Sequence, residues 1–403
     1  MLTSEATVAR RSSVDRQPPS PERSDVVYTF SYMTWHGAAR RGWFMPEDRL
    51  VHSLLADRRV GRLLVADTLR RLPAKLMPRR GSRADSPRLD PDDRLGRVEP
   101  VRLLNARPTS LRGVERAFRR YDRQLRVAAA RMGLNRPAVI TANPLAAGFA
   151  DFSWARSVTF YAVDDWTRSP LYQRWWPMYE EAYRRIGTRR LRVAAVSPAL
   201  RDRLAPPEQS VLVSNGLEPT EWVGAGAPPE WSTGDSRPLL VYAGTLDARL
   251  DVSTLLDLAQ ALPDARIVLV GPVGDSATIA AVRAAANIEI RPRLDRIPYA
   301  GLLRRADVGL IPHVRSELTF TIEPQKVYEY LAGGLPVVSL DVPPIRGISE
   351  RVRLVDAHGD FAGQVRAALA AGRATETDRL AFVEANSWRA RHERLIGLAV
   401  RVE

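Results

Sequence analysis

A lysine stands where this chain would ordinarily use arginine. The segment 321–339 reads TIEPQKVYEYLAGGLPVVS and contains Lys326. The chain holds 60 Lys and Arg residues, and the only other lysine is Lys75. A lysine ammonium is a compact point charge on a flexible stem, whereas the arginine guanidinium is a rigid planar fork. The exception at Lys326 therefore raises the question of what this ammonium binds.

The segment around Lys326 is predicted to be a helix whose first turn meets an anion. Pro324 suits the first helical position, and Gly333 with Gly334 ends the helix. A helix N-terminus carries a partial positive charge and unpaired N–H groups. A lysine in the first turn opposes this dipole, so a bound anion such as a diphosphate would offset the unfavourable charge.

Glu329 follows Lys326 by three residues and lies on the same helix face. A carboxylate can accept hydrogen bonds from both hydroxyls of a ribose. The pair thus predicts a site for a nucleoside diphosphate, with Lys326 on the phosphates and Glu329 on the ribose. The alternative is a surface ion pair of Lys326 with Glu323 or Glu329, which needs no ligand.

The elements that must position this pair alternate between strand and helix. Short apolar runs rich in β-branched residues are followed by helical patterns, which predicts parallel sheets covered by helices. The segments that contain the predicted strands are 25–30, 60–67, 137–144, 157–166, 191–204, 209–219, 238–247, 265–274, 308–313 and 335–341.

A Pro- and Gly-rich break at residues 216–236 divides this pattern into two domains. We expect an α/β chain with two Rossmann-like, doubly wound domains, 25–215 and 237–380, that face a central cleft. Residues 381–403 are predicted to be a helix that packs back on the N-terminal domain. Ligands of such sheets bind at the carboxyl ends of the strands, which places the site in the cleft.

Composition excludes several classes of protein. The 403 residues contain no cysteine, which excludes disulfides and thiolate metal sites and fits a reducing cytoplasm. No apolar run reaches the length of a transmembrane helix. The first 24 residues lack the apolar core of a secretory signal and are predicted to be a disordered tail.

The net charge of +14 is concentrated in one stretch. Residues 58–120 hold 18 Lys and Arg against 7 Asp and Glu, a net of +11. Such a stretch suits the anionic inner face of a membrane. A solvated surface of an arginine-rich chain is the alternative. Nucleic acid is disfavoured, because no nucleic-acid motif accompanies the charge.

The segment PQKVYEYLAGGLPVVS resembles the C-terminal-domain signature of retaining glycosyltransferases with the GT-B fold, of the family 4 type. More narrowly, it resembles a subgroup that builds bacterial cell-surface polysaccharides. The segments AAVSPALRDRL, VLVSNGLEP, LLVYAGTLDARLDVSTLLDLA, ARIVLVGP and IPYAGLLRRADVGLIPH agree in order and spacing. The resemblance covers about residues 135–345.

The resemblance implies a set of donor-binding residues. In that family the second glutamate of an E-x7-E pair contacts the ribose, and Glu329 matches it. The first glutamate, which holds the donor sugar, is replaced by Thr321, and Glu323 is the candidate substitute. Gly244 and Thr245 occupy the phosphate loop, where Thr245 stands at the place of a family arginine.

Arg249 falls near the family's phosphate-binding lysine, after a gap of one residue. Arg249 and Lys326 are therefore the expected diphosphate pair. Together they would neutralise the leaving diphosphate as its bond to the sugar breaks.

The catalytic candidates of the N-terminal domain are weaker. Asp164 and Asp165 end a predicted strand, where either carboxylate can orient or deprotonate an acceptor hydroxyl or serve a structural role. His36 follows the first strand. Further candidates, each with an ordinary structural alternative, are Asn143, His313 and the tryptophans Trp166, Trp175 and Trp176.

No metal cofactor is expected. The Asp-x-Asp at 90–92 lies in an irregular region, and five scattered histidines form no ligand cluster. The sequence thus predicts a cytoplasmic, metal-independent glycosyltransferase that uses a nucleotide diphosphate-sugar at the inner face of the membrane. The alternatives are a GT-B nucleotide-sugar epimerase and a catalytically silent nucleotide-binding scaffold.

Overall fold

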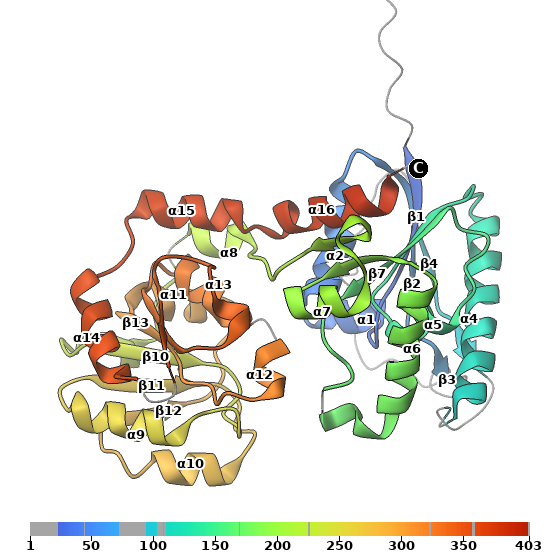
Figure 1. Ribbon diagram of the computed structural model, residues 1–403. Helices are drawn as coiled ribbons and strands as arrows, with labels where there is room; N and C mark the ends of the chain where they lie inside the picture. Colours follow the sequence, from blue (N-terminus) through green and yellow to red (C-terminus); the bar gives the residue numbers. More distant parts are fainter. Residues whose placement is uncertain are drawn as a thin grey trace, which may run out of the picture.

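The computed structural model describes two domains that lie side by side (Figure 1). The described residues are 23–43, 45–71, 94–102, 108, 110–168, 170–224, 226–321, 324–356 and 359–401. Side chains are not described at residues 71, 170, 171 and 321. Most of the expected N-terminal tail and parts of the basic stretch 58–120 lie outside the described residues.

The N-terminal domain is built on a seven-stranded sheet with the order β4-β2-β1-β6-β7-β8-β9. Every neighbouring pair of strands is parallel. The strands are β1 (Ser24–Thr29), β2 (Val60–Ala66), β4 (Leu95–Val98), β6 (Ala138–Thr141), β7 (Ser157–Ala162), β8 (Arg192–Ala195) and β9 (Ser210–Leu212). A separate short pair joins β3 (Arg70–Arg71) to β5 (Val101–Arg102).

Helices cover both faces of this sheet, because successive side chains of a buried strand point to opposite sides. The helices are α1 (Trp35–Arg40), α2 (Pro46–Ala56), α4 (Leu111–Arg131), α5 (Pro144–Phe149), α6 (Trp176–Thr188) and α7 (Pro198–Leu204). Tyr28 of β1 packs with Leu54 of α2, whereas Val27 packs with Phe118 of α4 on the other face.

The C-terminal domain repeats this plan with the strand order β12-β11-β10-β13-β14-β15, again all parallel. The strands are β10 (Leu239–Ala243), β11 (Arg266–Val270), β12 (Ile288–Arg291), β13 (Val308–Ile311), β14 (Val337–Leu340) and β15 (Val352–Val355). The helices are α9 (Val252–Ala261), α10 (Ser276–Val282), α11 (Arg296–Arg305), α12 (Glu317–Thr321), α13 (Gln325–Ala332), α14 (Phe361–Ala371) and α15 (Glu376–Ala385). The predicted fold class, two doubly wound parallel-sheet domains, is confirmed.

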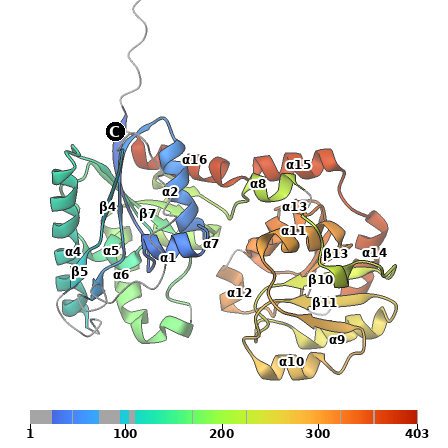
Figure 2. The ribbon, with the colours of Figure 1, turned by 180° about the vertical axis from the view of Figure 1, so that it is seen from behind.

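Two segments cross between the domains, and they lie next to each other. The linker contains the short helix α8 (Pro219–Val223), and α16 (Trp388–Val400) follows the second crossing. The Leu217 N–H donates to the Asn386 carbonyl at 2.8 Å, and the Trp388 N–H donates to the Leu217 carbonyl at 2.8 Å. Leu395 of α16 belongs to the core of the N-terminal domain. α15 and α16 thus span both domains (Figures 1 and 2).

Each sheet reverses its winding at one point, between β1 and β6 and between β10 and β13. At such a point the loops of the two neighbouring strands leave in opposite directions and open a crevice at the carboxyl edge. Ser31 and Asn143 follow β1 and β6, while Gly244 and His313 follow β10 and β13. The topology therefore brings residues from distant parts of the sequence to these two edges.

The start of α13 differs from its prediction. Pro324 is the residue before the helix rather than its first residue, with an extended backbone at φ −74° and ψ 115°. The first helical hydrogen bond runs from the Val327 N–H to the Pro324 carbonyl at 3.2 Å. Lys326 is therefore the second helical residue and remains in the first turn.

Candidate active site

A cavity of about 380 Å³ lies between the two domains. Val163 and Val196 line it from the N-terminal domain, and Ala243 and Pro324 line it from the C-terminal domain. The predicted site residues that line it are Asp164, Gly244, Arg249, Lys326 and Glu329. The carboxyl edges of both sheets thus contribute to one hollow.

Lys326 is held by neutral groups. Its Nζ lies 3.1 Å from Tyr242 Oη and 3.2 Å from His313 Nε2. Burial lowers the pKa of His313 well below its ordinary value, so its ring is neutral at pH 7 and can accept from the ammonium. Within the described residues Lys326 forms no ion pair, which contradicts the surface pair with Glu329.

The ammonium of Lys326 loses its proton readily. Burial, and then the charge of Arg249, lower its pKa to about 7. The charges of Glu329 and Asp247 act in the opposite direction. A bound anion beside Nζ would favour the charged form.

The loop after β10 approaches Lys326 closely because residue 244 has no side chain. A Cβ atom at Gly244 would lie 2.8 Å from Lys326 Nζ, and one at Gly271 would clash with the Gly244 carbonyl oxygen. Both glycines have a strongly positive φ, +155° and +153°. Glycine at both positions leaves bare backbone beside the ammonium, which suits a phosphate group.

Arg249 is a second cation of this end of the cavity. Its Nε and Nη2 donate to the Asp247 carboxylate at 2.9 and 2.8 Å. Its side chain is 33 % exposed, and further guanidinium N–H groups remain for a ligand. Arg249 and Lys326 line the same cavity, where both cations can act on one anion. The charge of Arg249 also lowers the pKa of Lys326.

Glu329 is fixed by two donors. Arg296 Nη1 donates to Oε1 at 2.7 Å, and Tyr299 Oη donates to Oε2 at 2.7 Å. Burial raises the pKa of Tyr299 well above its ordinary value, so the hydroxyl keeps its proton and acts as a donor. Each carboxylate oxygen retains a lone pair, so Glu329 can still accept hydrogen bonds from a ribose.

A chain of charged side chains links Glu329 to the N-terminal domain. Arg296 Nε also donates to Glu221 Oε2 of α8 at 3.0 Å. Arg49 of α2 donates to Glu221 Oε1 at 2.7 Å and to Glu218 Oε2 at 3.0 Å. The ribose candidate is therefore connected through the linker to the opposite domain.

Asp164 faces the cavity from the N-terminal domain. Burial raises its pKa to about 6, and the Asp165 N–H donates to its Oδ1 at 2.8 Å. A carboxylate with a pKa near neutrality suits a general base, because it is ionised yet basic enough to take a proton.

Two catalytic candidates lie elsewhere. Asp165 is 4 % exposed and accepts hydrogen bonds from Thr167 and Arg203, so it anchors the loop instead of facing the cavity. His36 lines a separate hollow beside Asp67, because the Trp35 N–H at the start of α1 donates to Asp67 at 2.7 Å. The structure does not bring either residue to the interdomain cavity.

The remaining donor candidates contribute less. Thr245 does not line the cavity, because its methyl group packs toward Gly274 and its carbonyl accepts from Tyr242 Oη at 3.1 Å. Thr321 ends α12, and its side chain is not described. Glu323 lies outside the described residues. The predicted sugar-holding roles of Thr321 and Glu323 stay predictions.

The weaker candidates fall in two places. His313 lines the interdomain cavity. Asn143 caps α5, with its Oδ1 accepting from the Leu145 N–H at 3.0 Å, and lines a second cavity of about 490 Å³ in the N-terminal domain. Trp166 and Trp175 line this second cavity as well.

Sequence reasoning missed Arg296, Glu221 and Arg49. One signal was available for Arg296, which is the first residue of α11 and opposes that helix dipole as Lys326 opposes its own. No local signal marks Glu221 or Arg49, because their contacts join segments far apart in the sequence.

Solved structures resemble the chain over almost its whole length. The UDP-forming trehalose-phosphate synthase of Burkholderia xenovorans matches with a TM-score of 0.63 and 12% identity, over 94% of this chain and 99% of that one. Anabaena HepE, in complex with UDP and glucose, matches with a TM-score of 0.54 and 13% identity, over 94% of this chain and 97% of that one. WaaG, a glycosyltransferase involved in lipopolysaccharide biosynthesis, matches with a TM-score of 0.54 and 13% identity, over 93% of this chain and 99% of that one. The chain has the GT-B fold.

At these identities the likeness extends to the fold alone. No family model and no curated protein matches the sequence. The predicted GT-B architecture is confirmed, whereas the family 4 type and the cell-surface subgroup stay predictions.

Proposed function

We propose that the chain is a glycosyltransferase that moves a sugar from a nucleotide diphosphate-sugar to a cell-surface polysaccharide or glycolipid precursor. One observation carries this proposal: the cavity presents two basic side chains, Lys326 and Arg249, together with a fixed carboxylate, Glu329. A nucleoside diphosphate offers an anion for the two basic side chains and a ribose diol for the carboxylate within one ligand.

In this reaction the bond between the anomeric carbon and the diphosphate oxygen breaks, and its electron pair leaves with the diphosphate. Lys326, Arg249 and the N-terminus of α13 stabilise the departing charge. The acceptor hydroxyl oxygen bonds to the anomeric carbon, and its proton passes to Asp164. Retention at the anomeric carbon, which the sequence resemblance implies, is part of the proposal. It requires the acceptor oxygen to bond on the face from which the diphosphate leaves. No metal cofactor is included.

The proposed setting is the cytoplasmic face of the membrane. The likeness of sequence segments to the cell-surface polysaccharide subgroup and the net charge of +14 support it. WaaG, which shares the fold, takes part in lipopolysaccharide biosynthesis. Within the described ranges no helix combines the length and the apolar character needed to cross a bilayer.

A labelled-sugar assay tests the proposal. The full chain is incubated with nucleotide diphosphate-sugars, beginning with UDP-glucose, which the HepE structure holds, in the presence and absence of a bacterial glycolipid extract. We expect release of nucleoside diphosphate and label in the lipid fraction. An altered sugar still attached to the nucleotide would support the epimerase instead. Binding without any turnover would support the silent scaffold.

A further inference from the structure

The outer face of α4 carries an unusual concentration of arginine. The chain has 60 Lys and Arg among 403 residues, whereas α4 has seven arginines among 21 residues, against only Glu115 and Asp122. This share is more than twice the chain average. Compositional bias toward arginine therefore does not account for the helix.

The seven arginines form one stripe. Arg119 and Arg120 are adjacent, the other successive arginines are three to five residues apart, and all are exposed: Arg112, Arg116, Arg119, Arg120, Arg123, Arg126 and Arg131. The opposite side of the helix is buried in the domain core through Val114, Phe118, Tyr121, Leu125 and Ala129. Helical spacing thus puts the charges on one face and the packing on the other.

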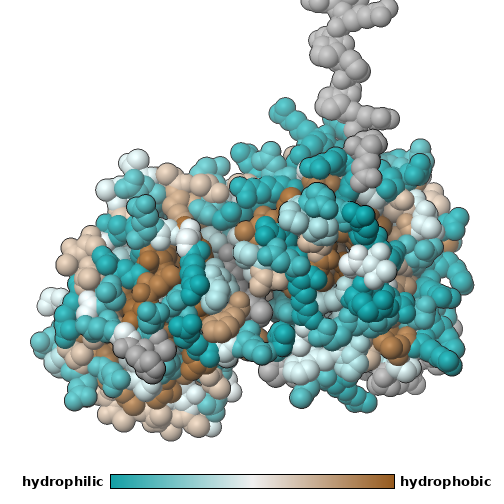
Figure 3. Space-filling view, in the orientation of Figure 1, coloured by the Kyte–Doolittle hydropathy of each residue, from teal (hydrophilic) through white to brown (hydrophobic). Residues whose placement is uncertain are grey.

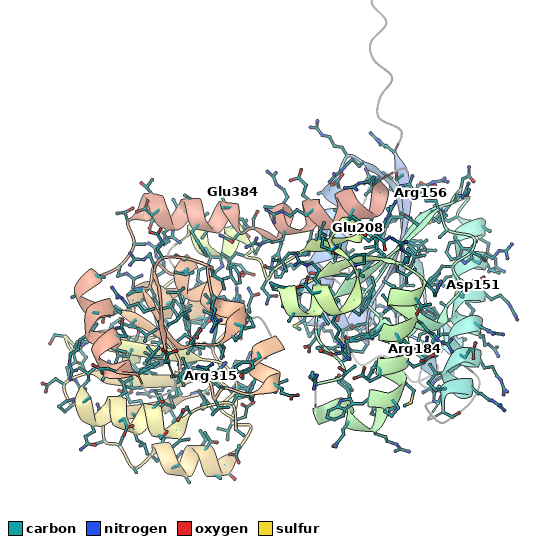
Figure 4. The ribbon with its side chains drawn as sticks, in the orientation of Figure 1. Asp151, Arg156, Arg184, Glu208, Arg315 and Glu384 are labelled. Carbon is teal, nitrogen blue, oxygen red and sulfur yellow. The ribbon has the colours of Figure 1, made fainter. Side chains whose placement is uncertain are left out.

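Few acids neutralise this stripe. Glu115 pairs with Arg119 at 2.9 Å, and Asp122 accepts from the Phe152 N–H and from Trp154 Nε1. Across the part of the chain that the structure describes, the other six arginines of α4 form no ion pair. Side chains that end in nitrogen project from the outer side of α4 in Figure 4. Hydrophilic side chains cover this edge of the molecule in Figure 3.

We propose that α4 docks the protein on an anionic membrane surface. The arginine stripe complements a layer of lipid phosphates, and Val127, which is 44% exposed, lies among the arginines where it can enter the headgroup region. This proposal rests on the proposed function, because docking would bring the glycosyltransferase to a lipid-linked acceptor.

The position of α4 supports this partner over nucleic acid. Val114, Ala117 and Phe118, on the inner side of α4, line the second cavity together with Tyr32 and Trp166. Trp166 follows Asp164 by two residues and so joins this cavity to the loop that carries Asp164. Docking through the outer face of α4 thus leaves the aromatic-lined hollow behind this helix, on the side of the residue proposed to take the acceptor proton.

Sedimentation with vesicles tests the docking. The full chain is mixed at low salt with phosphatidylcholine vesicles, or with vesicles in which one third of the lipid is phosphatidylglycerol. We expect binding to the anionic vesicles only and release as salt rises, because screening shortens the reach of each charge. The triple variant Arg116→Gln, Arg120→Gln, Arg123→Gln should bind about a hundredfold more weakly.

A matched variant controls for net charge. The triple variant Arg283→Gln, Arg366→Gln, Arg394→Gln removes three exposed arginines, one directly after α10, one from α14 and one from α16. It should bind anionic vesicles as the parent does. Equal loss in both triple variants, or equal binding to neutral vesicles, would overturn the proposal. The proposal would also be overturned, in favour of nucleic acid, if the parent bound duplex DNA but not vesicles and the α4 variant lost the DNA binding.

Nucleotide affinity, measured on the same samples, separates this proposal from the proposed function. The α4 variant should keep the affinity of the parent for nucleoside diphosphate, because α4 does not line the interdomain cavity. Vesicle binding without any nucleotide binding would leave the docking surface intact and contradict the glycosyltransferase. Nucleotide binding with no vesicle binding would contradict the docking alone.

Discussion

At the scale of single residues, Lys326 is defined by what surrounds its ammonium. Tyr242 and His313 are neutral, Arg249 is a cation, and among the described residues the carboxylates of Glu329 and Asp247 act on it without forming an ion pair. Such an environment lowers the pKa of a lysine and makes its charge conditional on a ligand. The place of Lys326 in the first turn, against the helix dipole, predicts from the sequence that this ammonium meets an anion.

The lowered pKa of Lys326 predicts a pH dependence of nucleotide binding. Free Lys326 titrates near pH 7, and a bound diphosphate raises its pKa, so binding above pH 7 takes up a proton. The phosphates are already ionised in this range. The affinity for nucleoside diphosphate should therefore fall about tenfold for each pH unit above 7. Below pH 7 Lys326 is already protonated and adds no further pH dependence.

Calorimetric titration in buffers of different ionisation enthalpy measures this proton uptake. The variant Lys326→Ala should bind more weakly and lose the slope, because its site has no titrating ammonium. A parent protein with a flat profile between pH 7 and pH 9 would show that Lys326 stays charged without the ligand.

The two neighbouring aspartates should behave differently. Asp164→Asn should lower the transfer rate by about a hundredfold or more and leave nucleotide affinity unchanged, since it removes only the base. In the parent the rate should rise with pH through about 6, as Asp164 ionises. Asp165→Asn should instead lower the free energy of unfolding by about 1–3 kcal/mol, because an amide NH2 replaces the charged oxygen that accepts from Arg203, while the remaining oxygen still accepts from Thr167.

Rate–pH profiles and denaturant titrations on both variants distinguish these roles. If Asp165→Asn abolished transfer in a fully stable protein while Asp164→Asn kept the parent rate, the assignment of the two carboxylates would be reversed.

At the scale of elements, helices α8, α11 and α13 meet around Arg296. Its guanidinium donates to Glu329 of α13 and to Glu221 of α8. Arg296→Gln should weaken nucleoside diphosphate binding about tenfold, because Glu329 loses one of the two donors that orient it. Pyrophosphate affinity should not change, since pyrophosphate has no ribose.

Tyr299→Phe should have a smaller effect on nucleoside diphosphate affinity than Arg296→Gln. It removes one hydrogen bond from Glu329 and keeps the ring, so a smaller loss confined to nucleoside diphosphate is expected. Equal losses for both ligands in Arg296→Gln would mean that Arg296 contacts the phosphates itself.

The elements themselves were largely predictable. Strands such as β10 and β11 are short apolar runs that end in glycine, and helices such as α13 end at paired glycines. The start of α13 was misplaced by one residue, because the sequence does not show whether Pro324 takes a helical or an extended backbone. The network of Arg49, Glu221 and Arg296 was not predictable, because these charged residues lie far apart in the sequence and only tertiary packing brings them into contact.

At the scale of the whole molecule, the site is assembled from parts that neither domain supplies alone. The basic groups and Glu329 come from the C-terminal domain, Asp164 comes from the N-terminal domain, and Glu221 lies on the linker. The two crossing segments are joined by backbone hydrogen bonds of Leu217 with Asn386 and with Trp388. The relative position of the domains therefore sets the distance between donor and acceptor sites.

The central claim is that this cavity holds a nucleoside diphosphate, with Lys326 on the phosphates and Glu329 on the ribose. Isothermal titration of the parent, Lys326→Ala and Glu329→Gln with UDP and with pyrophosphate tests it most directly. We predict that Lys326→Ala weakens both ligands roughly ten- to hundredfold, because it removes a charge-assisted contact. We predict that Glu329→Gln weakens UDP and leaves pyrophosphate unchanged. Unchanged affinity of Lys326→Ala for both ligands would contradict the claim.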